Sequence, residues 1–193
     1  MIKTEHPHIF VAVPLPDEIK SVLSEWSHTL RRQWPFRKWV HPSDYHITLQ
    51  FLGACPPAQV ETVKQHLSQA LPPLPSFTLG LKGLNVFGQR RKPRILWADV
   101  TGDKHTLAHL QQHVASTLER IGFPREQRPY RPHITLAKHY RKDHFSFDQL
   151  SSYTVTETKD LEWRVQEIVL YQTHLGRTPM YEPLQTYSFT ETE

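Results

Sequence analysis

The sequence contains a single cysteine, Cys55, among its 193 residues. One cysteine cannot form an internal disulfide and carries no metal-binding signature, so a reducing, cytoplasmic location is expected. Long hydrophobic runs are also lacking. The longest one near the start, Ile9–Val13, is far too short to cross a bilayer or to form the hydrophobic region of a signal peptide. These features argue against a disulfide-rich secreted scaffold, and no membrane partner is predicted.

Low-complexity tracts and linkers between the two halves are absent as well. A hydrophobic content of 38% and an aromatic content of 11% are typical of a soluble globular protein of this length. We therefore expect one compact domain of two lobes, residues 1–193. The net charge of +4 favours an anionic partner such as RNA. Nothing in the sequence predicts an obligate protein partner.

The tetrapeptide His-Ile-Thr-Leu occurs twice, at residues 46–49 and 133–136. The β-branched and apolar residues around the two copies predict strands at Tyr45–Leu52 and Pro132–Tyr140. Alternate side chains of a strand share a face, so each histidine points to the same side as its threonine and away from the two aliphatic residues. Each strand thus buries Ile and Leu and presents an imidazole beside a hydroxyl.

A lone histidine on a half-buried strand is usually a satisfied or solvated polar residue, and the chain has 13 histidines. The duplication is harder to explain by packing, because an open strand face would accept Ser, Gln or Lys equally well. The repeated His-x-Thr pattern therefore favours a functional site.

Two His-x-Thr-apolar motifs, one in each half of a chain of this size, resemble those of the two-histidine (2H) phosphoesterase superfamily. Within it, the sequence is similar to the RNA 2′,3′-cyclic phosphodiesterases, also called 2′-5′ RNA ligases (the LigT/ThpR family). His46–Gly53 fits the first motif of that family and Arg94–Val100 resembles its central strand. Gly176–Thr178 and Tyr181–Leu184 resemble its C-terminal hairpin. The resemblance covers almost the whole chain.

The remaining pattern predicts helices and strands in alternation. Helices are expected at Pro16–Leu30, Pro56–Leu71 and Asp103–Ile121, and further strands at Ile9–Pro14, Phe77–Val86, Arg94–Val100, Trp163–Leu175 and Tyr181–Phe189. The order strand, helix, histidine strand occurs twice and suggests two lobes related by an approximate two-fold axis. We expect an α+β fold with two pseudo-symmetric lobes, antiparallel sheets facing a central cleft and helices on the outside, as the resemblance also implies.

Two segments have the composition of a nucleic-acid contact. Residues 31–40 interleave Arg and Lys with Trp and Phe, which fits either single-strand binding or a solvated loop with anchoring aromatics. The expected loop at residues 88–93 is the densest positive patch of the chain. A substrate-facing role is slightly favoured there over a solubility role.

The two imidazoles suit the opening of a cyclic phosphodiester, in which water enters on one side of phosphorus and an alkoxide leaves on the other. An unperturbed histidine has a pKa of about 6.5. Near neutral pH one histidine of the pair His46 and His133 can therefore be neutral and act as a base, while the other is protonated and acts as an acid. Thr48 and Thr135 can donate hydrogen bonds to the non-bridging oxygens. This chemistry requires neither a metal ion nor an organic cofactor.

A metal site is not predicted, because no nearby carboxylate or cysteine completes an obvious ligand set and neither copy reads His-x-His. Nucleophilic catalysis by Cys55 is not favoured either. This residue has no assigned base, and a lone cysteine is more often a small buried apolar residue.

The resemblance implies further site residues. Phe51 would lie along the base of the substrate, and Lys138 stands where the family usually has arginine, which replaces a bidentate fork by a point charge. In an ideal strand Lys138 would face away from His133. Phe51 would point to the core side of its own strand, so packing in the core is an equal alternative to substrate contact for Phe51. Arg131 precedes His133 by two residues and would point to the same face in a regular strand. Because Pro132 between them disturbs the register, Arg131 is only a secondary candidate.

We therefore expect hydrolysis of an RNA or nucleotide 2′,3′-cyclic phosphate to a 2′-phosphomonoester, accompanied by RNA 2′-5′ ligation. The direction of opening, the ligation, and the roles of His133 as base and His46 as acid are implied by the resemblance alone. Two alternatives remain open. One is a non-catalytic module that binds RNA ends. The other is a 2H enzyme for a small nucleotide, such as ADP-ribose cyclic phosphate or a 2′-5′ oligoadenylate.

Overall fold

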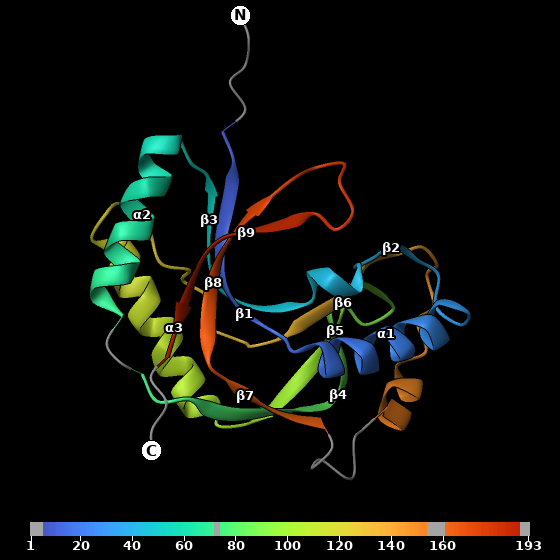
Figure 1. The fold of residues 1–193 in the computed structure, drawn as a ribbon. Helices are drawn as coiled ribbons and strands as arrows, with labels where there is room; N and C mark the ends of the chain where they lie inside the picture. Colours follow the sequence, from blue (N-terminus) through green and yellow to red (C-terminus); the bar gives the residue numbers. More distant parts are fainter. Residues whose placement is uncertain (1–5, 72–73, 154–160, 190–193) are drawn as a thin grey trace, which may run out of the picture.

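The computed structural model describes residues 6–71, 74–153 and 161–189. Within these ranges the strands form one antiparallel sheet in the order β7-β4-β5-β6-β3-β1-β8-β9, with β2 paired to β6 (Figure 1). The strands are β1 His8–Pro14, β2 Phe36–Trp39, β3 His46–Ala54, β4 Phe77–Gln89, β5 Lys92–Gly102, β6 Ile134–Tyr140, β7 Glu162–Val165, β8 Glu167–Thr173 and β9 Tyr181–Ser188. The helices are α1 Asp17–Arg31, α2 Pro57–Ala70 and α3 Lys104–Glu119, with short 3-10 turns η1 Pro42–Asp44 and η2 Phe147–Tyr153.

The sheet consists of two halves that meet at the two motif strands. One half contains β3, β1, β8 and β9, and the other contains β7, β4, β5, β6 and β2. β3 and β6 are joined by a single residue pair, Ile47 with Ile134, and both side chains are fully buried. The predicted α+β class with antiparallel sheets is confirmed. Both repeated tetrapeptides lie at the junction of the halves.

The helices are exchanged between the halves. α1 follows β1 in the chain, yet Figure 1 shows it beside β4, β5 and β6. α3 follows β5, yet it lies with α2 on the other half, where the side-chain amide of Gln111 donates to the carbonyl of Leu49 on β3 at 3.3 Å. Because each half is covered by a helix whose preceding strand belongs to the other, we infer that the two halves form one domain.

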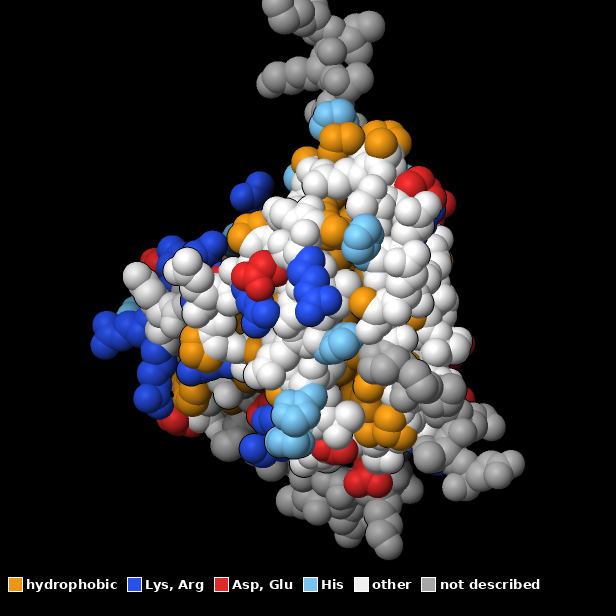
Figure 2. All heavy atoms as spheres, turned by 90° about the vertical axis from the view of Figure 1, so that its left-hand side faces the viewer, with side chains coloured by type: hydrophobic (Ala, Val, Ile, Leu, Met, Phe, Trp, Pro, Cys, Tyr) orange, Lys and Arg blue, Asp and Glu red, His pale blue; other side chains and the backbone are white. Residues whose placement is uncertain are grey.

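The buried aliphatic residues lie between the sheet and these helices. Each motif contributes an Ile and a Leu to this core, as the alternation predicts, and none of the four is more than 3% exposed. The helix-covered side carries a line of histidine side chains on its surface (Figure 2). Among the described residues, no helix is long and apolar enough to cross a membrane.

Two segments differ from the predicted elements. Residues 36–39, which lie in the segment of interleaved basic and aromatic residues and were not predicted as a strand, form β2 and pair with β6. β4 and β5 extend well into the predicted loop at residues 88–93, so that only Arg90 and Arg91 form the turn. Polar residues in a short edge strand or at the tip of a hairpin have little sequence preference for a strand, because pairing with the neighbouring strand rather than composition holds them extended.

Candidate active site

His46 stands at the first position of β3, separated by one residue from the end of the turn η1. Its Nδ1 lies 2.7 Å from the backbone carbonyl oxygen of Asp44, and its Nε2 lies 3.0 Å from Oγ1 of Thr48. A carbonyl oxygen can only accept a hydrogen bond, so Nδ1 carries the proton. In the neutral ring the lone pair is therefore on Nε2, where the hydroxyl of Thr48 donates to it.

His133 repeats this arrangement in the second motif. Its Nδ1 lies 2.7 Å from the carbonyl oxygen of Arg131, two residues earlier in the chain, as in the first motif. The same tautomer is thus fixed in both rings, and Nε2 is the nitrogen left for chemistry in each.

The pairing of β3 with β6 brings the two motifs together. In an antiparallel register that pairs Ile47 with Ile134, His46 falls beside Thr135 and His133 falls beside Thr48. The two paired isoleucines point into the core, so the residues on either side of them point to the opposite face. Both histidines and both threonines therefore share one face of the sheet, as predicted.

A bulge in β6 sets the direction of Lys138. The register between β5 and β6 shifts at this point, and the consecutive residues Leu136 and Ala137 are both fully buried. The extra residue reverses the alternation, so Lys138 returns to the face of Thr135. The expectation from an ideal strand, that Lys138 faces away from the histidines, is wrong for this reason.

β3 contains the equivalent bulge. Leu49 and Gln50 are both buried, and the register with β1 shifts between the partners of Thr48 and Gln50, so that Leu49 is the extra residue. Phe51 consequently lies on the face of Thr48 and is 60% exposed, so the core-packing alternative does not hold. Phe51 and Lys138 occupy equivalent positions, each five residues after its histidine, and the internal repeat thus extends beyond the tetrapeptide.

Burial and nearby charge lower the pKa of both imidazoles. Burial brings the pKa of His46 down to about 4; the carbonyl of Asp44 opposes this shift, and the positive charges of His133 and Lys138 add to it. Burial, again opposed by a backbone carbonyl, also lowers the pKa of His133, and Lys138 contributes in the same direction. Lys138 is therefore close enough to act on both rings. Near neutral pH both histidines are neutral in the free protein.

Asp44 organises the site in a way that the sequence did not predict. Its side chain is only 5% exposed, and its carboxylate accepts hydrogen bonds from the backbone amides of Met180, at 3.0 and 3.1 Å, and Tyr181, at 3.1 Å. One residue thus holds His46 through its carbonyl and the start of β9 through its carboxylate.

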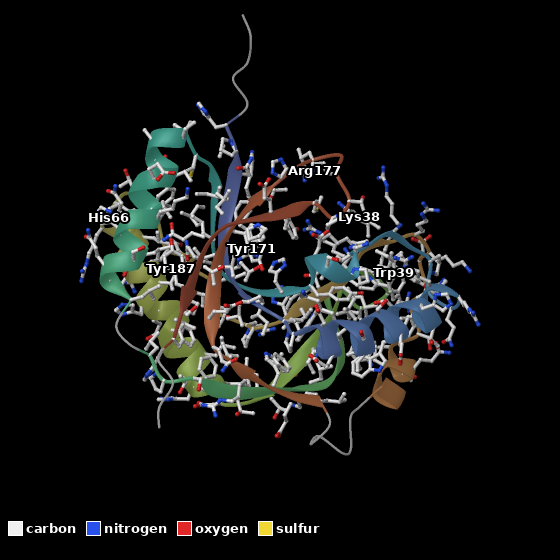
Figure 3. The ribbon with its side chains drawn as sticks, viewed as in Figure 1. Lys38, Trp39, His66, Tyr171, Arg177 and Tyr187 are labelled. Atoms are coloured by element: carbon white, nitrogen blue, oxygen red, sulfur yellow. The ribbon has the colours of Figure 1, made fainter. Side chains whose placement is uncertain are left out.

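Aromatic rings surround both histidines. Phe10 and Tyr181 lie 4.9 and 5.2 Å from the ring centre of His46, and Tyr171 on β8 lies 6.3 Å away (Figure 3). Phe87 and Trp97 lie 5.0 and 5.8 Å from His133. These rings exclude water from the imidazoles, which accounts for the lowered pKa values. The sequence placed these residues in strands, or outside any predicted motif, without indicating that they meet.

Arg131 contributes its backbone rather than its side chain. Its carbonyl holds the ring of His133, while its guanidinium is exposed. The residue before it, Tyr130, donates its hydroxyl to the carbonyl of Thr48 at 3.2 Å. The segment before the second motif is thereby tied to the first motif.

The two segments with nucleic-acid composition are partly occupied by contacts within the protein. Trp34 and Phe36 are 2% and 5% exposed, so they anchor residues 31–40 in the core. At the β4–β5 turn, the guanidinium of Arg90 lies 4.4 Å from the ring centre of Phe147, and Nζ of Lys92 lies 2.8 Å from a carboxylate oxygen of Asp143. Contact of these basic groups with RNA remains a prediction.

In the described part of the chain, no three His, Cys, Asp and Glu side chains are grouped so that they could hold a metal ion. Cys55 is fully buried, and this burial raises the pKa of its thiol. A buried neutral thiol is a packing residue rather than a nucleophile, as predicted.

Known proteins are similar to this chain over most of its length. The family model of the 2′-5′ RNA ligase superfamily matches residues 15–177. The chain is 34% identical over 178 residues to an RNA 2′,3′-cyclic phosphodiesterase of Bacillus subtilis, covering 92% of this chain and 94% of that protein. It is 37% identical over 181 residues to one of Geobacillus stearothermophilus, covering 93% of this chain but only 56% of that protein.

Solved structures show the same fold. Escherichia coli LigT complexed with 3′-AMP superposes with a TM-score of 0.79 at 24% identity, over 96% of this chain and 100% of that chain. The Thermus thermophilus protein TT0787 superposes with a TM-score of 0.76 at 24% identity, over 96% of this chain and 100% of that one.

Proposed function

The chain belongs to the 2′-5′ RNA ligase superfamily, and from this premise we propose that it is an RNA 2′,3′-cyclic phosphodiesterase whose acid and base are His46 and His133. The relatives named above support the activity. The assignment of His46 and His133 as acid and base is supported by the tautomer that the two rings share. Both imidazoles lie on one face, and in each a backbone carbonyl holds Nδ1 and leaves Nε2 for the substrate.

The reaction is an in-line displacement at phosphorus. Nε2 of His133 takes a proton from water as the water oxygen bonds to phosphorus, and the bond from phosphorus to the 3′-oxygen breaks. Protonated Nε2 of His46 gives its proton to the departing 3′-oxygen. The products are a 2′-phosphomonoester and a free 3′-hydroxyl, and proton transfer of this kind contributes about 10²–10⁴-fold to the rate. The direction of opening and the order of the two histidines follow the resemblance.

The hydroxyls of Thr48 and Thr135 stabilise the charge that develops on the non-bridging oxygens. In the free protein the hydroxyl of Thr48 is engaged by His46, and it turns to the phosphate when His46 becomes protonated. Lys138 adds a positive charge on the same face, and the exposed ring of Phe51 offers a surface on which the terminal base stacks.

Ligation follows from the same arrangement. When the 5′-hydroxyl of a second RNA replaces water as the attacking group, its oxygen bonds to phosphorus, the bond from phosphorus to the 3′-oxygen breaks, and the base and acid act as before. The products are a 2′-5′ phosphodiester and a free 3′-hydroxyl. A cytoplasmic location is part of the proposal, since the one cysteine, Cys55, stays a buried free thiol.

The experiment that tests the function is product identification in the presence of a chelator. The purified protein is incubated with EDTA and either 2′,3′-cyclic mononucleotides or a cyclic-phosphate-ended oligonucleotide, and the products are separated by chromatography. We expect 2′-phosphates at an undiminished rate. Absence of product from every substrate would favour a module that only binds RNA ends, and activity that EDTA removes and added metal restores would contradict metal-independent chemistry.

The lowered pKa values predict an acidic optimum for kcat/KM, which reports the free enzyme. Only the pair with a single proton is active, because above the higher of the two pKa values both histidines are neutral and no acid remains, and below the lower one both are protonated and no base remains. Because the pKa of His46 is about 4 and that of His133 is below its usual value of about 6.5, the maximum should lie between these two pH values.

The low-pH limb of the plot of kcat/KM against pH is therefore expected at a lower pH than an unperturbed histidine would give. Bound phosphate raises both pKa values by its negative charge, so the maximum of kcat is expected at a higher pH than that of kcat/KM. The pH dependence of initial rates, measured from pH 3.5 to 9 at constant ionic strength, tests both points. A kcat/KM that still rises above pH 8 would contradict them.

A further inference from the structure

Two lysines face each other beside the candidate active site. Lys38 on β2 is the direct partner of Lys138 on β6 in the antiparallel register. Side chains opposite one another in such a pair have Cβ atoms about 4.5–5.5 Å apart, and like charges in this position destabilise the sheet. Lys38 is exposed at the edge of the sheet, whereas Lys138 is half-buried (Figure 3).

The protein does not neutralise this pair. Among the described residues, the ion pairs involve neither Lys38 nor Lys138. Nζ of Lys38 donates to Sδ of Met180 at 4.0 Å, a weak and uncharged acceptor. Burial and the charge of Lys38 lower the pKa of Lys138. The basic side chains of Lys92 and Arg177, by contrast, have carboxylate partners. An uncompensated like-charge pair is a cost to the fold that a bound anion would remove.

The position of the pair relative to the histidines indicates which anion this is. The bulge in β6 puts Lys138 on the same face as Thr135 and the two histidines, where its charge acts on both rings. Lys138 is therefore beside the place that the proposed reaction gives to the cyclic phosphate. β2 lies on the same edge of β6 as β3, further along β6 from the pair of Ile47 and Ile134, so Lys38 stands beside Lys138 on that edge. Lysine is a point charge on a long flexible stem, and two opposed lysines can therefore reach two phosphates that are neighbours in one nucleic-acid strand.

We propose that Lys38 binds the phosphate on the 5′ side of the terminal nucleotide while Lys138 faces the cyclic phosphate. An RNA chain, or a nucleotide with a 5′-phosphate, is then preferred as substrate over a simple nucleoside cyclic phosphate. This inference rests on the proposed function, because it assumes that the cyclic phosphate lies between the two histidines.

Three substrates test the inference: adenosine 2′,3′-cyclic phosphate, the same nucleotide with a 5′-phosphate, and the dinucleotide ApA with a 2′,3′-cyclic phosphate end. One added charge-assisted contact should raise kcat/KM of the wild type by about 10-fold for the second and third relative to the first. Lys38→Met should abolish this preference without changing turnover of the first, and Lys38→Arg should retain it.

Lys20→Met is the matched control, since it removes one positive charge from α1, away from the site. It should leave the preference unchanged. Equal kcat/KM for all three substrates in the wild type, or an equal loss for all three in Lys38→Met, would overturn the inference. Thermal unfolding of each variant separates loss of contact from loss of folding.

A binding measurement keeps this test independent of the proposed function. Calorimetry with adenosine 2′-phosphate and adenosine 2′,5′-bisphosphate compares ligands that differ by the 5′-phosphate alone. The bisphosphate should bind about 10-fold more tightly to the wild type and equally to Lys38→Met. If no substrate is turned over, the proposed function fails. If the two ligands bind the wild type equally, the role of Lys38 fails.

Discussion

His46→Ala and His133→Ala are each expected to lower kcat/KM for a cyclic-phosphate substrate by about 10²–10⁴-fold, the range for loss of a general acid or base. Each variant removes one of the two Nε2 atoms that face the substrate. Because both protons move in one displacement, the double variant should be much less than multiplicatively slower. Initial rates of product formation with all three variants measure this.

The same variants separate an enzyme from a binding module. If the histidines act on bond breaking, the variants should still bind a cyclic-phosphate-ended oligonucleotide and fail only to open it. His66→Ala is a matched control, because His66 lies on α2 at the helix-covered side, with its Nδ1 2.9 Å from the carbonyl of Thr62 (Figure 3). Full activity in either active-site variant, or comparable loss in His66→Ala, would refute the assignment.

Asp44→Ala is expected to lower the free energy of unfolding by about 2–4 kcal/mol, because charge-assisted hydrogen bonds contribute about 1.5–3 kcal/mol each and the partly buried amides lose their acceptor. The amides of Met180 and Tyr181 would be left without the carboxylate. Tyr181 packs against His46, so kcat/KM should fall as well, even at temperatures where the variant is folded.

Urea unfolding measures the change in stability, and Asp17→Ala provides the control. The side chain of Asp17 is 96% exposed and forms an ion pair with Lys20 at 3.6 Å, an arrangement that contributes about 0–1 kcal/mol. A free energy of unfolding for Asp44→Ala within about 0.5 kcal/mol of the wild type, the range of ordinary surface substitutions, would show that the carboxylate does not hold β9.

The histidine pair could be predicted because its signal is local. The alternation within each tetrapeptide fixes which side chains share a face, and the duplication indicates that the two faces act together. The helices were equally predictable, since Pro57 opens α2 and Asp103 caps α3 with a hydrogen bond to the amide of Thr106.

The directions of Lys138 and Phe51 could not be predicted, because each depends on a bulge. A bulge is a mismatch between two paired strands, and a single strand read by itself carries no record of it. The same limit applies to Asp44, whose carboxylate binds the backbone of Met180 and Tyr181, more than 130 residues further along the chain. Backbone amides have no sequence signature.

The exchange of helices between the two halves was likewise not contained in the pattern. The repeat of strand, helix and histidine strand gives the order of elements along the chain, and this order is observed for β1, α1 and β3 and again for β5, α3 and β6. Which half each helix covers depends on the complementarity of buried surfaces across the molecule, which periodicity does not encode.

The central claim, that His46 is the acid and His133 the base of one displacement, is tested most directly by a substrate with sulfur in place of the 3′-oxygen. A thiolate leaves with hardly any need for a proton, so loss of the acid should matter little. We expect the sulfur substrate to restore most of the lost rate to His46→Ala and none to His133→Ala. Rescue of His133→Ala instead would exchange the two roles. Rescue of neither variant would contradict acid catalysis by this pair.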